Sequence, residues 1–284
     1  MEHRLRRFIL LGPGLTWLAV FLVVPCALVF TYSFFERGVY GGIDYVFGLS
    51  NYVRALDPLY LKIFLQSLKI AVIATGLALV IGYPAAYFIA GAPANRQTAL
   101  LILAILPFWS NYLIRTYAWM VLLNREGLIN RSLAAVGVID EPLPLLYNDF
   151  AIVVGLLYAY LPFMILTLYS SIARLGPALR EASADLGAGW VQTFLRVTLP
   201  LTVPGIAAGC VFVFVLSIGN FITPDLLGGG RRIMIGNLIY DQFLSARDWP
   251  FGASLALILI GIMMLLLFLQ AWLVNRSAAG AVRA

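Results

Sequence analysis

Long runs of uncharged, apolar residues constrain this chain more than any other feature. The run 8–35 contains no charged residue, and four comparable runs follow it along the sequence. A helix needs about 20 mostly apolar residues to cross the hydrocarbon core of a bilayer. Of the 284 residues, 62% are hydrophobic and 11% are charged, whereas soluble domains carry about 25% charged residues. The sequence therefore predicts an all-α, polytopic membrane protein.

Six transmembrane helices fit this pattern. Five of them lie in charge-free runs, whereas the third contains Arg115, which must either snorkel to the membrane surface or face the protein interior. Short helices are expected outside the spans at SNYVRAL and in the segment IGNLIYDQFLSARDW. We place the six spans at 8–35, 66–90, 98–123, 150–172, 206–223 and 251–274.

The distribution of basic residues predicts the orientation. The segments on the two sides of the membrane hold nine and eight Lys and Arg residues, which is nearly a tie. Three arginines precede the first span, and the first span usually dominates the positive-inside rule. We therefore expect both termini inside the cell and the loops 36–64, 124–149 and 224–250 outside.

The segment 181–205, between spans four and five, predicts a helix–glycine–helix elbow on the inner side. Leu179, Ala182 and Leu186 are spaced three and four apart and share one helix face. Gly187 suits the left-handed residue that ends a helix. A second short helix is expected from Trp190 to Leu199, and we expect the ring of Pro200 to end it.

This elbow resembles the EAA loop of ABC importer permeases, whose pattern is Glu-Ala-Ala, three residues, Gly, nine residues, Ile, one residue, Leu-Pro. Two positions depart mildly from it, Ser183 in place of Ala and Val197 in place of Ile. Asp185 lies within the same elbow. The residues that match the family's coupling site, with Asp185, are Glu181, Ala182, Ser183, Asp185, Gly187, Val197, Leu199 and Pro200.

The resemblance implies a type I ABC importer permease in the bacterial cell (inner) membrane. The elbow is expected to dock on a dimer of a separate cytoplasmic ATPase that carries the ATP and Mg, so no cofactor is expected in this chain. A second permease subunit and an extracytoplasmic solute-binding protein are the other expected partners. The implied division is an N-terminal segment with span one, 1–64, a permease core, 65–275, with its EAA loop at about 173–205, and a cytoplasmic tail, 276–284.

Other functions are disfavoured by missing residues. No GxxxxGK[ST] phosphate loop and no HExxH motif occur, and the single His and two cysteines form no metal, nucleophile or disulfide pattern. Nothing in the sequence indicates nucleic acid or an enzyme. The alternative from another class is an autonomous channel or secondary carrier, which the elbow and the lack of intramembrane proton-relay residues oppose.

Several stretches resemble the spermidine/putrescine-type permeases in particular. They include PFWSNYLIRTYAWM, YLPFMILTLYSSI, TPDLLGG and RDWPFGASLAL. This resemblance implies a small cationic solute as the cargo. Permeases for opines, amino-acid-like amines or iron share parts of the same stretches and remain alternatives.

Four residues near the outer ends of spans are candidates for the path of a cation. Asp225 follows Thr223-Pro224, and a carboxylate there offsets part of the hydration that an ammonium group loses. Trp109 and Tyr112 offer aromatic faces for cation–π contacts, beside Arg115. The alternatives are a solvated loop residue or helix cap for Asp225, and an ordinary interfacial aromatic belt with a snorkelling Arg for the others.

Overall fold

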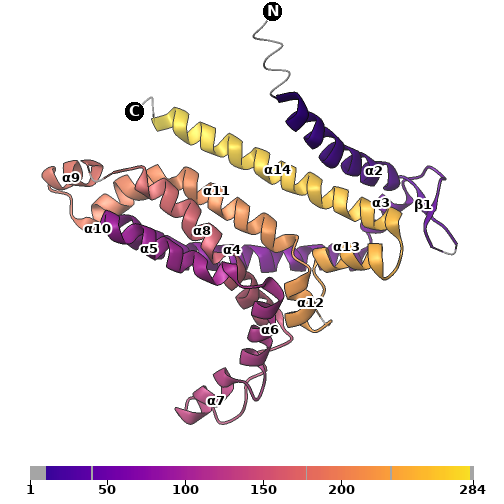
Figure 1. The fold of residues 1–284 in the computed structure, drawn as a ribbon, viewed down its shortest axis with the longest axis horizontal. Coiled ribbons are helices and arrows are strands. Elements are labelled where there is room, and N and C mark those ends of the chain that lie inside the picture. Colours follow the sequence, from indigo (N-terminus) through magenta and orange to yellow (C-terminus); the bar gives the residue numbers. More distant parts are fainter. Residues whose placement is uncertain (1–10, 40, 177, 231, 282–284) are drawn as a thin grey trace, which may run out of the picture. The chain divides into compact units, whose positions relative to one another are not determined.

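A computed structural model describes residues 11–39, 41–176, 178–230 and 232–281. Two short strands, β1 (Glu36–Arg37) and β2 (Ile43–Asp44), pair antiparallel with Glu36 opposite Asp44. The other regular elements of the described residues are helical (Figure 1). After a helix that covers Leu11–Tyr32 and includes η1 (Ala19–Val23) and α2 (Val24–Tyr32), they are α3 (Ser50–Ala55), α4 (Pro58–Gly91), α5 (Ala94–Ile105), η2 (Leu106–Trp109), α6 (Tyr112–Leu123), α7 (Leu128–Ala135), α8 (Asp149–Ala173), α9 (Ala178–Asp185), α10 (Trp190–Thr193), η3 (Phe194–Thr198), α11 (Leu199–Ile218), α12 (Ile222–Gly228), α13 (Ile235–Leu244) and α14 (Trp249–Ala281).

The prediction of an all-α membrane protein is confirmed. Among the described residues, five helices are long and apolar enough to cross a bilayer, and a sixth span results if one bent helix pair is counted as a single crossing. The short helices expected outside the spans are present as α3 and α13. The five straight candidates are Leu11–Tyr32, Pro58–Gly91, Asp149–Ala173, Trp190–Ile218 and Trp249–Trp272.

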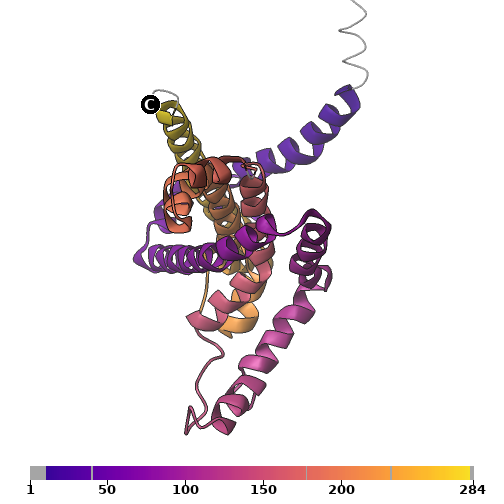
Figure 2. The ribbon, with the colours of Figure 1, turned by 90° about the vertical axis from the view of Figure 1, so that its left-hand side faces the viewer.

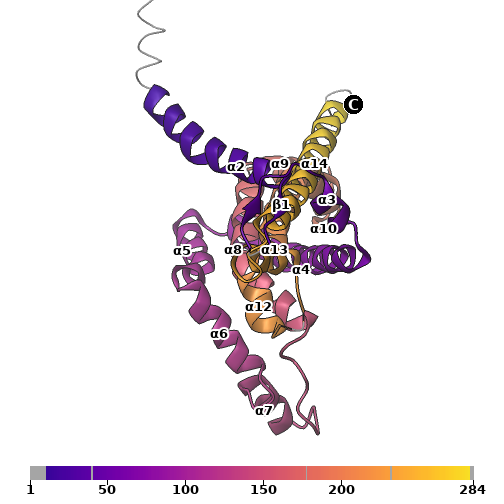
Figure 3. The same ribbon diagram turned by 90° about the vertical axis from the view of Figure 1, so that its right-hand side faces the viewer.

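The third span is broken, and its prediction as one helix over 98–123 was wrong. The segments Ala94–Trp109 and Tyr112–Ala135 meet at an angle of 85°. Ser110 is extended there, and the side chain of Asn111 accepts hydrogen bonds from the backbone N–H groups of Leu113 and Ile114. An Asn cap of this kind starts a new helix. Figure 3 shows α5, α6 and α7 following one another along this broken segment.

The fifth span begins much earlier than predicted, because Pro200 does not end the second elbow helix. The chain is helical without interruption from Trp190 through α10, η3 and α11 to Ile218. The residues just before Pro200 form the π-helical turn η3, which is wider than an α-helical turn. Proline usually breaks a helix by clashing with the preceding turn, and the wider turn leaves room for its ring.

The chain divides into two compact units, and residues 63–237 with 263–284 form the larger one. Its centre is the packing of α8 against α11, which lie side by side (Figures 1 and 2). A Cβ added at Gly205 would collide with Ser171 of α8, and one at Gly209 would lie 2.9 Å from the sulfur of Met164. Small residues at such positions let membrane helices approach closely.

Residues 1–62 and 238–262 form the second unit. Its main polar contact joins α3 to the start of α14, where Arg54 donates to the fully buried carboxylate of Asp248 over 2.7 Å. The guanidinium of Arg54 also lies 3.9 Å from the ring centre of Phe251. Buried charges need such pairing, because removing one partner leaves the other unsatisfied. The pair therefore fixes the loop after the first span onto the last span.

Candidate functional site

The first elbow helix, α9, ends in the manner that the sequence predicts. Gly187 has φ +79°, and the left-handed conformation expected for it is confirmed. The N–H of Gly187 donates to the carbonyl of Ala184 over 2.8 Å, and the N–H of Ala188 donates to that of Ser183 over 3.1 Å. These two bonds form a Schellman motif, which satisfies the last carbonyls of a helix and turns the chain sharply.

The solvent-exposed face of α9 has few contacts within the chain. Glu181, Ala182 and Asp185 are exposed, and the side chain of Leu186 is 89% exposed. Leu179 is also largely exposed, at 43%. These exposed side chains are available for contacts with another protein.

The buried side of the elbow is held by one side-chain hydrogen bond. The hydroxyls of Ser183 in α9 and Thr193 in α10 lie 2.9 Å apart, and both residues are buried. Ser183 is one of the two departures from the family pattern, and an Ala in its place has no hydroxyl to make this bond. Ser183, Gly187 and Val197 also line one cavity of about 260 Å³ between α9 and η3. The elbow residues therefore form one structural element.

The second half of the elbow is anchored on α4. Phe194 contacts the rings of Tyr83 and Tyr87 edge-on, with ring centres 5.7 and 5.8 Å apart. Leu199 packs against the same buried cluster, whereas Pro200 is exposed. The rings that Phe194 contacts come from α4, which lies about 100 residues earlier in the chain, so only the fold shows this anchor.

A second polar cluster lies where α6, α8 and α12 meet. The side-chain amide of Asn220 donates to the hydroxyls of Tyr112 and Tyr160, each over 2.6 Å. Its carbonyl oxygen accepts from the backbone N–H of Thr223 over 2.9 Å, and the Thr223 and Tyr112 hydroxyls are hydrogen-bonded. We call Tyr112, Tyr160, Asn220 and Thr223 the polar network. The sequence analysis did not identify Tyr160 and Asn220. A polar Asn directly after a long apolar run was the signal that could have identified Asn220.

Arg115 is buried beside this network. Its guanidinium carbon lies 5.5 to 6.0 Å from the ring centres of Phe108, Tyr112 and Tyr158. Its Nε and Nη1 atoms are buried and have no hydrogen-bond partner among the described residues. Arg115 thus faces the protein interior, where the surrounding rings compensate part of its lost hydration.

The remaining two path candidates lie outside the network. Trp109 ends η2 and is 79% exposed, and Asp225 is exposed on α12. The helix α12 itself packs against α8 and α6, with Gly155 of α8 so close that a Cβ would lie 2.5 Å from Leu227. The structure therefore brings Tyr112 and Arg115 together and leaves Trp109 and Asp225 on the surface.

These features define a class of protein before any comparison is made. The described residues contain no group of three or more His, Cys, Asp or Glu that could hold a metal. They do contain several apolar spans, an exposed elbow and a polar network between helices. This combination is typical of a multi-pass membrane transport subunit.

The chain belongs to the family described as binding-protein-dependent transport system inner membrane component, whose model matches residues 8–278. It is therefore a multi-pass inner-membrane transport subunit and not an enzyme. It is 44% identical over 266 residues to the spermidine/putrescine transport system permease protein PotB of Salmonella typhimurium (strain SL1344), covering 93% of each chain. It is also 44% identical to PotB of Escherichia coli (strain K12), covering 92% of this chain and 96% of that one.

A solved structure shares the fold. A chain of a bacterial alginate ABC transporter, in complex with an alginate pentasaccharide-bound periplasmic protein, superposes with a TM-score of 0.77. The match covers 97% of this chain and 96% of that chain at 18% sequence identity. The fold is therefore that of an ABC importer permease, as expected from the EAA resemblance.

The hydrogen bond between Ser183 and Thr193 gives a prediction about elbow stability. We expect Ser183→Ala to lower the free energy of unfolding by about 1 kcal/mol, because it leaves the buried Thr193 hydroxyl without its partner. A double-mutant cycle with Thr193→Val, read by thermal unfolding in detergent, measures the pair directly. Thr167→Val is the control, because that hydroxyl bonds to the carbonyl of Phe163 in its own helix. Purely additive effects of the two elbow changes would contradict the prediction.

The left-handed backbone at Gly187 gives a second prediction. Gly187→Leu strains this position by on the order of 1 kcal/mol or more, although no atom crowds the new Cβ. We expect the variant to insert normally. Substrate-stimulated ATP hydrolysis by the assembled importer should fall about fivefold, because this strain would weaken the expected docking of the elbow on the ATPase by about that factor. Gly189→Ala is the matched control, because Gly189 has φ −69° and equally open space. Equal loss in both variants would argue against a role for the left-handed turn.

Proposed function

We propose that this chain forms half of the transmembrane pathway of an ATP-driven importer for a polyamine such as putrescine or spermidine. The observation that carries the proposal is the identity of 44% over 93% of the chain to a spermidine/putrescine permease. The exposed elbow supports the coupling part of the proposal. A channel or secondary carrier has no need for a surface of this kind.

The elbow would connect this chain to a separate ATPase. Leu186, Ala182 and Asp185 present a mixed apolar and acidic face that suits a groove on a cytoplasmic ATPase dimer. ATP and Mg would bind to that dimer. A second permease subunit would complete the pathway, and an extracytoplasmic binding protein would deliver the solute, which matches the periplasmic protein bound to the alginate transporter.

The structure changes which residues suit a cationic cargo. Arg115 already faces the ring of Tyr112, so this ring is poorly placed to receive an ammonium group as well. The exposed ring of Trp109 and the carboxylate of Asp225 carry no such conflict. Several weak contacts of this kind suit transport, because the solute must also leave. We therefore keep Asp225 and Trp109, and not the ring of Tyr112, as candidate contacts for the cation.

The proposed orientation can be tested by cysteine labelling in intact cells. The test uses a protein in which Cys26 and Cys210, the free cysteines among the described residues, are replaced by Ser. A reagent that cannot cross the inner membrane should label Asp140→Cys in the outer loop and should not label Ala182→Cys in the elbow. Both residues are exposed in the structure, so accessibility within the chain does not bias the comparison. Labelling of Ala182→Cys from outside would contradict the proposed orientation.

The proposed path predicts that Asp225→Asn lowers uptake of radiolabelled spermidine about two- to fivefold, the effect of one exposed charge contact. The assay uses cells that carry the whole importer, and copurification of the ATPase should not change. Asp140→Asn, which removes an exposed carboxylate from another outer loop, is the control. Unchanged uptake would remove Asp225 from the path. No polyamine uptake by the parent protein would overturn the substrate while leaving the permease class in place.

A further inference from the structure

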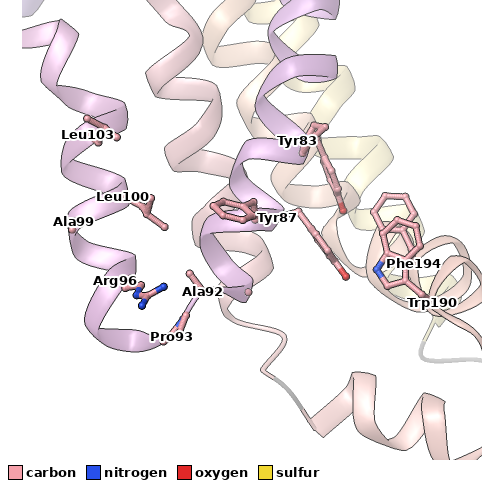
Figure 4. Close-up of a pocket in the computed structure, with 13 residues that line it drawn as sticks. Tyr83, Tyr87, Ala92, Pro93, Arg96, Ala99, Leu100, Leu103, Trp190 and Phe194 are labelled. Carbon is pink, nitrogen blue, oxygen red and sulfur yellow. The ribbon is translucent and has the colours of Figure 1, made fainter.

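A large cavity lies between the end of α4, the start of α5 and the second elbow helix. Its volume is about 960 Å³, within the range of small-molecule sites. Figure 4 shows Tyr83, Tyr87, Trp190 and Phe194 on one side and the α5 residues Arg96 and Leu100 on the other. All of its walls belong to the larger unit of the chain. We call this space the elbow pocket.

The lining of the elbow pocket is amphipathic. Twelve of its residues are apolar, aromatic or glycine, and the remaining one is Arg96. The guanidinium of Arg96 makes no hydrogen bond and no ion pair with other described residues, and the side chain is exposed. The ring of Trp190 is 69% exposed and stacks on Phe194 with ring centres 6.1 Å apart. A ligand that fits must therefore combine a long apolar part with an anionic group.

We propose that the elbow pocket binds an anionic phospholipid of the membrane, with the phosphate on Arg96 and an acyl chain along Leu100, Leu103 and the aromatic wall. Basic pockets between the ends of membrane helices bind anionic headgroups. Tyr and Trp side chains prefer the headgroup level of the bilayer. Tyr87 and Trp190 line the same pocket as Arg96, which matches this arrangement. With the orientation proposed above, this lipid belongs to the inner leaflet of the membrane.

Other ligand classes fit the elbow pocket less well. A polyamine would meet the positive charge of Arg96 and no carboxylate, because the lining contains no Asp or Glu. A free phosphate would satisfy Arg96 but leave the apolar wall exposed to water, which is unfavourable in proportion to its area. A phospholipid satisfies both parts of the lining, and a protein that spans a membrane is surrounded by such molecules.

A bound lipid would act on coupling, because the elbow pocket joins two parts of the transport mechanism. One wall is the end of α4, where Tyr83 also hydrogen-bonds Thr202 of α11 over 2.9 Å. Trp190 and Phe194, which follow the elbow turn at Gly187, lie on the same side as Tyr83, and the α5 residues Arg96 and Leu100 lie opposite (Figure 4). Filling the space between the two sides would hold α5 against α4 and the second elbow helix. The importer should therefore hydrolyse ATP more rapidly in response to substrate when anionic lipid is present.

The experiment uses the complete importer in nanodiscs of phosphatidylcholine, with and without added phosphatidylglycerol. Native mass spectrometry measures the lipid retained, and ATP hydrolysis is measured in parallel. We expect Arg96→Gln to weaken phosphatidylglycerol binding about fivefold, the contribution of one basic side chain near a headgroup. Arg96→Lys should keep most of the binding. Ala99→Trp should displace the lipid by filling the pocket while Arg96 is still present.

Arg174→Gln is the matched control, because Arg174 is an exposed arginine just after α8 that does not line the elbow pocket. Its phosphatidylglycerol binding should equal that of the parent. Unchanged retention in both Arg96→Gln and Ala99→Trp would overturn the site. Equal losses of phosphatidylcholine and phosphatidylglycerol would overturn the preference for an anionic headgroup. Lipid retention does not require transport, so failure of polyamine uptake would leave this test intact.

Discussion

The close packing of α8 against α11 is the contact on which the larger unit depends. In a bilayer, apolar side chains gain little by leaving lipid, so helices associate through tight backbone contact and polar bonds. Gly205 and Gly209 of α11 face Ser171 and Met164 of α8 without room for a Cβ, and Gly155 gives α12 the same close access to α8. The helix α8 is therefore the central support, and the polar network is built from elements that pack around it.

The continuity of the helix from α10 to α11 connects these two regions. Thr193, near its first end, holds the elbow through Ser183. Asn220, two residues past its last end, organises the polar network. Because one continuous helix links both regions, a displacement of the elbow would reach the network along it. The π turn η3 is where this helix departs from regular geometry and where it can bend most easily.

Most of the fold could be predicted from apolar runs and one motif, because each span must satisfy its own backbone within the lipid. The left-handed turn at Gly187 could also be predicted from the sequence, because few residues other than glycine tolerate that conformation. The failures have local causes. Asn111 starts a new helix where a continuous apolar pattern predicted one span, and the π turn accommodates Pro200. The polar network joins residues 60 and 108 positions apart, and no local pattern encodes such a distance.

Arg115 disfavours a cation on the neighbouring ring of Tyr112. An ammonium group on the face of Tyr112, about 6 Å from the guanidinium, would be repelled by about 3 kcal/mol at an effective dielectric constant of about 20. A cation–π contact returns only about 0.5 to 2 kcal/mol. The exposed Asp225 can offset part of this repulsion, but it lies outside the network that Arg115 adjoins. Within the described residues, the buried Nε and Nη1 atoms of Arg115 have no acceptor. The ring of Tyr112 is therefore a poor site for a cation, because the guanidinium of Arg115 already lies close to it.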